Sequence, residues 1–178
     1  MYSVNSYIEQ KSEKLLVESK CYRVPIPIEN CAKYLDIKLE PLELDENVAG
    51  FLLLKDDKVV HIGYNKSNPK NRIRFTIAHE IGHYLLHAKD STLFVDKEVL
   101  YRDVNSSTGE LLREREANAF AASLLMPQKL ITQEVDKHKK EPTDKLISQL
   151  AKKFKVSQQA ITIRLSNLGV IDYDAFAS

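Results

Sequence analysis

The chain has 178 residues, 43% of them hydrophobic and 29% charged, which is enough for one domain with a buried core and excludes disorder over most of the length. Its 26 basic and 25 acidic residues give a formal charge of +1, so neither a strongly basic nucleic-acid binder nor an acidic tail protein is favoured. No apolar run could span a bilayer and residues 1–14 lack the apolar block of a secretory signal, so we expect a cytoplasmic protein that does not contact membranes.

The first part of the chain predicts a small sheet. Before it, residues 1–20 indicate a polar helix or a mobile arm, and residues 26–35 have the apolar period of a short helix. Three segments then have the composition and alternation of strands: 36–44, 50–54 and 59–64. The last two are joined by four polar residues and predict a hairpin. Pro41 places the first strand at a sheet edge, because proline cannot donate to the hydrogen-bonded ladder.

The rest of the chain predicts helices. Four segments have helical periodicity: 72–87, 110–126, 144–154 and 157–168. Pro127 ends the second of them. The polar stretch 89–109 has no clear period, and we expect it to be irregular. A sheet followed by helices indicates an α+β fold.

Cys21 and Cys31 are the two cysteines of the chain. Two cysteines cannot form a disulfide framework, and their spacing matches no common zinc motif. We therefore predict that both are ordinary thiols in the core or on the surface.

The helix predicted at 72–87 contains the sequence HEIGH at residues 79–83, an H-E-x-x-H motif. Residues four apart lie one turn above each other on a helix, so His79 and His83 can share one Zn²⁺. Glu80 projects about 100° around the axis from His79. It can therefore act as general base toward a water that attacks a carbonyl. The alternative, a buried structural pair of histidines, does not account for the glutamate between them.

A catalytic zinc also needs a third protein ligand and one open position. In the helix predicted at 110–126, Glu114 and Asn118 lie four residues apart on one face. Glu114 could bind the metal while Asn118 holds a ligand histidine from behind. Glu116 lies on another face, where we expect it to pair with an arginine, and it is the less favoured third ligand. The alternative for Glu114 is a solvated surface charge.

Other residues near the motif have less certain roles by sequence. His87 continues the four-residue spacing, but the helix drifts by about 40° per four residues, so we expect it to orient a ligand or to pack. A group that stabilises the developing oxyanion is also required, and the sequence does not choose among three candidates: Tyr84, Tyr101 and His61. If the strand 59–64 were a sheet edge, a peptide could pair with it beside His61. We expect instead that His61 is an ordinary strand residue.

Two segments of the chain resemble the ImmA/IrrE family of metallopeptidases. They read RFTIAHEIGHYLLH at 74–87 and EREANAFAASLLMP at 114–127. The resemblance implies a gluzincin-like fold, in which a small twisted, mostly antiparallel sheet packs on the active-site helix and a glutamate of the next helix is the third zinc ligand. The family pattern E-x-x-A-(N/D) falls on Glu114 to Asn118. The resemblance also implies that the substrate is a helix-turn-helix repressor protein of a mobile element or a stress response.

The segments 144–154 and 157–168 resemble a helix-turn-helix. Ser157 is a suitable N-cap for the second helix. Its apolar stripe, Ile161, Leu165 and Leu168, would be buried, which leaves four polar residues toward base edges: Gln158, Gln159, Thr162 and Ser166. Residues 129–168 contain nine basic and four acidic residues, 9 − 4 = +5. A helix pair of this kind can equally pack on an enzyme core or bind a protein, and we do not favour direct DNA binding.

The sequence therefore predicts two units, a zincin-like peptidase domain at 1–127 and a helix-turn-helix-like helical subdomain at 128–178 packed on it. We expect a zinc-dependent endopeptidase in which His79, His83 and Glu114 bind Zn²⁺ and Glu80 is the general base. By the resemblance, cleavage of a repressor would derepress its target genes. Two alternatives stay open: a DNA-binding transcriptional regulator with a structural or sensory metal site, and a protein that inactivates a repressor without cutting it.

Overall fold

The computed structural model describes residues 4–54, 59–88, 93–97, 108–138 and 143–171. The helices of this part are α1 (Val4–Glu18), α2 (Ile28–Tyr34), α3 (Lys70–His87), α4 (Thr108–Leu125), α5 (Gln128–Lys137), α6 (Thr143–Phe154) and α7 (Gln158–Asn167). The strands are β1 (Ile37–Leu42), β2 (Val48–Leu54), β3 (Val60–Asn65) and β4 (Leu93–Lys97). The fold is α+β, as predicted. Among the described residues, no helix combines the length and the apolarity needed to cross a bilayer.

The four strands form one sheet in the order β1-β3-β2-β4. The pairs β2–β3 and β2–β4 are antiparallel and β1–β3 is parallel, so the sheet is mostly antiparallel, as expected. The predicted hairpin is β2–β3. Pro41 lies in β1 at one edge of the sheet, which confirms the position inferred from its missing donor.

One strand was not predicted. The stretch 89–109 was expected to be irregular, but residues 93–97 form β4 against β2. A strand of five residues has little periodicity of its own, and its partners in β2 lie 40 to 49 residues earlier in the chain. The conformation of this segment therefore depends on its pairing with β2, and the local sequence does not reveal that pairing. The rest of the stretch up to residue 107 lies outside the described residues.

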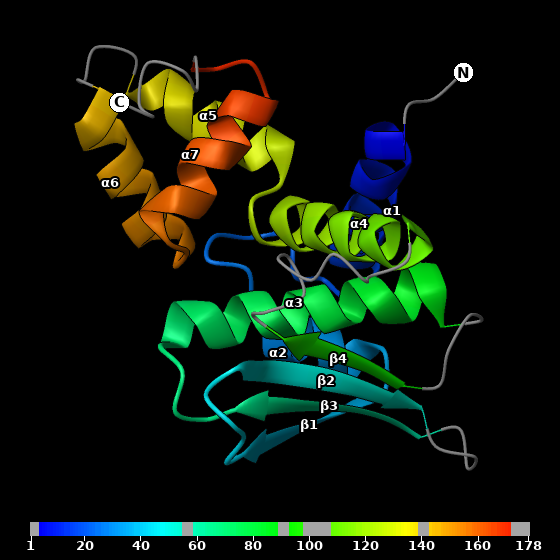
Figure 1. Ribbon diagram of the computed structural model, residues 1–178. Coiled ribbons are helices and arrows are strands. Elements are labelled where there is room, and N and C mark those ends of the chain that lie inside the picture. The colour runs from blue at the N-terminus through cyan, green and yellow to red at the C-terminus, as the bar shows by residue number, and fades with distance from the viewer. Residues whose placement is uncertain (1–3, 55–58, 89–92, 98–107, 139–142, 172–178) are drawn as a thin grey trace.

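The sheet, α3 and α4 are stacked in layers, with α3 lying across one face of the sheet and α4 on the far side of α3 (Figure 1). Leu52 and Ile62 are directly paired across β2 and β3 and are fully buried toward α3. Gly50 lies on the same face, where a Cβ atom would be 2.5 Å from Cγ2 of Thr76. The missing side chain thus permits the close approach of β2 to α3.

The turn between α6 and α7 is bonded to the first turns of α3. Asn71 Nδ2 donates to the carbonyl oxygen of Val156 at 3.2 Å, and Arg74 Nε donates to that of Lys155 at 3.3 Å. Arg74 Nη2 also donates to the carbonyl oxygen of Ile26 at 2.8 Å. The helix-turn-helix-like pair is therefore fixed to the same helix that carries the H-E-x-x-H motif.

The helix α7 has the N-cap and most of the buried stripe that the sequence predicts. Ser157 Oγ accepts from the backbone N–H of Ala160 at 3.1 Å. Ile161 and Leu165 are fully buried, whereas Leu168 is only partly buried.

Arg164 of α7 is not a surface cation. It is 5% exposed, and its Nη1 donates to Oε1 of Glu9 in α1 at 2.5 Å. Its Nε donates to the carbonyl oxygen of Met126 at 3.0 Å, and Ser123 Oγ of α4 donates to the same Glu9 oxygen at 2.8 Å. The network joins three helices, α1, α4 and α7. It removes Arg164 from the basic residues that could contact phosphate.

Replacing Arg164 with methionine is expected to lower the free energy of unfolding by about 2 kcal/mol. The variant leaves the Glu9 carboxylate without its charged partner and the Met126 carbonyl without its donor. Urea denaturation followed by circular dichroism measures the loss. Lys152→Met, which removes the same charge from an exposed position on α6, is the matched control and should change the stability by less than about 0.5 kcal/mol. Equal effects of the two variants would contradict the network.

Candidate metal centre

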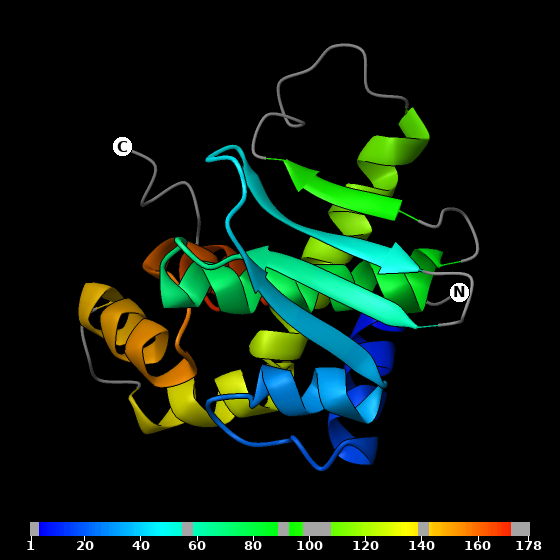
Figure 2. The same ribbon diagram turned by 90° about the horizontal axis from the view of Figure 1, so that it is seen from below.

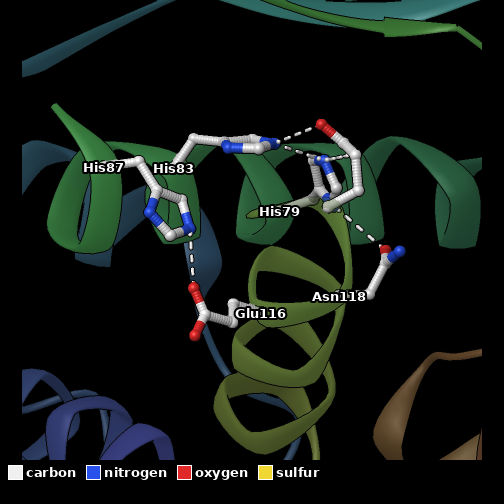
Figure 3. Close-up of polar contacts among 6 residues, drawn as sticks. His79, His83, His87, Glu116 and Asn118 are labelled. Atoms are coloured by element: carbon white, nitrogen blue, oxygen red, sulfur yellow. Dashed lines mark hydrogen bonds and ion pairs between the residues drawn. The ribbon is translucent and has the colours of Figure 1, made fainter. Parts of the chain in front are cut away.

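The structure brings together the three side chains predicted as metal ligands (Figure 3). His79 and His83 lie one turn apart on α3, both buried, with their Nε2 atoms 2.9 Å apart. Glu114 reaches across from α4, with Oε2 at 3.2 Å from Nε2 of His79 and Oε1 at 3.1 Å from Nε2 of His83. Two nitrogen and two oxygen atoms thus converge on one point.

This donor set fits a divalent metal ion. The ligand atoms of the three residues lie within 4.8 Å of one another. Tetrahedral zinc with bonds of about 2.0–2.1 Å would place its ligand atoms about 3.3 Å apart, close to the distances found here. Two imidazoles and one carboxylate, with a fourth position free for water or substrate, are also the ligand types of a catalytic zinc site.

Asn118 orients His79. The Oδ1 atom of Asn118 lies 3.0 Å from Nδ1 of His79. An amide oxygen can only accept, so Nδ1 of His79 donates to Asn118, and this contact directs Nε2 of the same ring toward Glu114. The spacing of four residues between Glu114 and Asn118 therefore has the consequence expected from the sequence. One helical face of α4 supplies a carboxylate to the centre and an acceptor behind one imidazole.

The Glu114 carboxylate is ionised at neutral pH. Burial raises the pKa of Glu114, but hydrogen bonds and charge interactions with His79 and His83 lower it more strongly, to about 2. An ionised carboxylate is the form that binds a divalent cation.

Glu80, the predicted general base, lies on α3 between the two histidines and is completely buried. A buried carboxylate is costly, because the charged form loses its hydration, and such groups in folded proteins are paired or functional. Glu80 directly follows His79 in α3, and its complete burial fits a role at a metal ion.

Two features hold the helices and rings in place. Phe94 of β4 stacks on the imidazole of His83, with ring centroids 4.7 Å apart and ring planes 20° apart. Gly82 lies where α3 meets α4, and a Cβ atom there would be 3.2 Å from the Cα of Ala117. Sequence reasoning missed Phe94 because it missed β4. The apolar run Leu93-Phe94-Val95 is the signal that could have indicated a strand beside the centre.

Glu116 and His87 form a separate pair. Nε2 of His87 lies 3.5 Å from Oε2 of Glu116, and Figure 3 shows this contact apart from the one between His79 and Asn118. The rings of His87 and His83 are tilted neighbours with centroids 5.7 Å apart. His87 thus packs beside one member of the convergent group, as its helical drift suggests. Glu116 thus contacts His87, whereas the sequence predicted an arginine as its partner.

Of the three candidates for oxyanion stabilisation, His61 is not brought to the centre. His61 lies in β3, an interior strand, and alternates with Ile62, so it points to the sheet face opposite α3. There its Nδ1 lies 2.6 Å from Oε1 of Glu40. The idea of a peptide pairing beside His61 is therefore wrong, and His61 is an ordinary strand residue. Tyr84 packs against the core from α3, and Tyr101 lies outside the described residues.

Replacing Asn118 with alanine is expected to weaken zinc binding by about 10–100-fold, because His79 would lose the acceptor that fixes its tautomer and ring orientation. Competition with a chromophoric chelator measures the dissociation constant. Asn118→Asp keeps an acceptor at this place and should recover most of the affinity. Equal losses in both variants would mean that Asn118 acts through packing alone.

Comparisons with known proteins agree with the geometry. Residues 32–166 match the M78 peptidase family through its IrrE N-terminal-like domain. The chain is 31% identical over 115 residues to an uncharacterised immunity region protein 2 of Bacillus phage phi105, covering 64% of this chain and 66% of that protein. It is 32% identical over 106 residues to the radiation response metalloprotease IrrE of Deinococcus radiodurans, covering 57% of this chain and 29% of that protein.

A solved structure shares the fold. The transcriptional regulator of Mycobacterium tuberculosis superposes with a TM-score of 0.58 at 17% identity, over 90% of this chain and 46% of that one. The chain thus spans less than half of this structure and less than a third of IrrE, and just under two thirds of the phage protein. The match over residues 32–166 includes the H-E-x-x-H helix, the Glu114 helix and most of the helix-turn-helix-like pair. The chain belongs to the M78 peptidase family, whose domain is described as IrrE N-terminal-like.

Proposed function

We propose that this chain is a zinc-dependent endopeptidase. The observation that carries the proposal is the convergence of His79, His83 and Glu114, with their ligand atoms within 4.8 Å, together with the complete burial of Glu80 on the helix of the two histidines. Membership of a metallopeptidase family, with a metalloprotease among the relatives, supports the same activity.

Each residue of the site has a defined task in peptide hydrolysis. His79, His83 and Glu114 would hold the ion, and a bound Zn²⁺ supplies a Lewis acid that polarises a carbonyl and lowers the pKa of water. Glu80 accepts the proton of the attacking water and delivers it to the leaving amine. Asn118 and Phe94 keep His79 and His83 in their orientations.

The strand β4 offers a place for an extended peptide. It is the outermost strand of the described sheet on the side of β2, and Phe94 connects it directly to His83. A peptide that adds to a sheet edge gains main-chain hydrogen bonds over several residues. A peptide paired with β4 would therefore pass beside the convergent ligands. The strand β3 cannot pair with a peptide, because it already lies between β1 and β2.

The proposed substrate is a helix-turn-helix repressor, and its cleavage would derepress genes of a mobile element or a stress response in the cytoplasm. Supporting this class, one relative is named as a phage immunity region protein and another as a radiation response metalloprotease. The rival function, DNA binding by α7, is less well supported, because Arg164 is buried and Lys153 is paired with Glu134.

The direct test is cleavage of the repressor encoded next to the gene of this chain. The purified protein is loaded with zinc and incubated with that repressor, and intact masses of the products are measured. Two fragments whose masses sum to the repressor plus one water are expected, and none after treatment with a chelator. A repressor that loses DNA binding while its mass stays intact would instead indicate inactivation without cutting. A DNA complex formed by this chain alone would favour the regulator.

A further inference from the structure

The first turns of α4 carry two exposed apolar side chains shortly before Glu114 in the chain. Leu111 is 40% exposed and Leu112 is 55% exposed, and both precede Glu114 within one turn. Seen from below, the N-terminal end of α4 extends beyond β4, the last strand on that side of the sheet (Figure 2). Single exposed leucines are common on protein surfaces, so exposure alone assigns no role. Their position relative to Glu114 does distinguish them.

Helix geometry places the two leucines on different sides of α4. At about 100° per residue, Leu111 lies about 60° around the axis from Glu114, whereas Leu112 lies about 160° away. Helical side chains tilt toward the N-terminus, so Leu111 extends beyond Glu114 along the same side of the helix. Asn118, about 40° from Glu114, confirms through its contact with His79 that this side of α4 faces the centre. Leu111 therefore borders the ligand group, and Leu112 faces away from it.

We propose that Leu111 determines specificity by packing against a large apolar side chain of the substrate, at the residue on one side of the scissile bond. The inference rests on the proposed peptidase activity and names its substrate class. A peptide paired with β4 would run between that strand and the first turns of α4. The exposed apolar surface of Leu111 would then be available to a side chain of that peptide. Burying that surface against a leucine or methionine removes apolar area from water.

The test is a cleavage profile on a mixture of peptides of natural sequence. The zinc-loaded wild type, Leu111→Ala, Leu111→Met and Leu112→Ala are incubated with the mixture, and the cut sites are read by mass spectrometry. We expect large apolar residues to be enriched at one position beside the cut for the wild type, Leu111→Met and Leu112→Ala. Leu111→Ala should lose the enrichment. Zinc content and melting temperature, measured for all four proteins, show whether each variant is folded and loaded.

A pair of synthetic peptides then gives the magnitude. For peptides that differ only by leucine or alanine at the enriched position, the ratio of kcat/KM values should be about 10–200 for the wild type, the range of hydrophobic discrimination. The ratio should fall to below about 5 for Leu111→Ala and stay unchanged for Leu112→Ala.

Failure of the inference differs from failure of the proposed function. Cleavage without apolar enrichment, or enrichment that persists in Leu111→Ala, would overturn the role of Leu111 and leave the peptidase standing. No cleavage of the mixture or of the repressor by the zinc-loaded wild type would overturn the peptidase, and the specificity proposal with it.

Discussion

Glu80→Gln is expected to lower kcat/KM for peptide hydrolysis by about 10²–10⁴-fold while the protein keeps its metal. Glutamine has nearly the same size as glutamate and fits the same buried position, but its amide cannot accept a proton from water. The measurement combines the initial rate of repressor cleavage with the metal content of the same sample. A loss of rate without a loss of metal separates proton transfer from ligation.

The matched control is Glu116→Gln. It makes the same chemical change on α4 at a carboxylate that contacts His87 instead of the convergent group. We expect this variant to retain at least about half of the wild-type rate. If Glu80→Gln removed the repressor as fast as the wild type, Glu80 would not be a general base. The chain would then be a binder or a regulator whose metal site is not catalytic.

The second large effect is loss of the metal. Protein purified without added metal is expected to contain one zinc per chain, and His83→Ala and Glu114→Ala should each retain less than about a tenth of it, because two remaining ligands cannot fill a tetrahedral site. Elemental analysis measures the content and identifies the ion. Since a ligand that binds only the folded state stabilises it, removal of the ion by a chelator should also lower the melting temperature of the wild type.

The control for these variants is His87→Ala. His87 continues the spacing of the two ligand histidines but lies beside Glu116, so zinc should stay at one per chain. If Glu114→Ala retained zinc, the third ligand would be a residue other than Glu114. A wild type that takes up no divalent metal, even when metal is added, would contradict the metal centre altogether.

The arrangement of the site follows from sequence wherever a helix fixes it. The spacings His79–His83 and Glu114–Asn118 each cover one helical turn, so periodicity alone places their side chains on a common face. The two segments that resemble the metallopeptidase family predict which helix follows the other and which sides of α3 and α4 face each other. Helical geometry also separates Glu114 from Glu116, which lie two residues apart and reach different histidines.

Other features could not be predicted because they depend on partners distant in the chain. The strand β4 is stabilised by β2, and Phe94 reaches His83 only because that pairing exists. The sequence also left residues 1–20 open between a helix and an arm. Packing stabilises the helix, because Ile8, Leu15 and Leu16 of α1 are buried in the core. Likewise, the burial of Arg164 depends on Glu9, 155 residues earlier.

The helix α1 precedes the segment that similarity to the family covers, which begins at residue 32. Yet α1 supplies core side chains, the Glu9 carboxylate and a hydrogen bond from Lys11 to the carbonyl oxygen of Leu85 in α3. A truncated protein starting at residue 32 would expose the apolar surface that α1 covers and would leave Arg164 uncompensated. The cooperative folding unit is thus larger than the unit recognised by similarity. Expression of the matched segment alone should yield aggregated or protease-sensitive material.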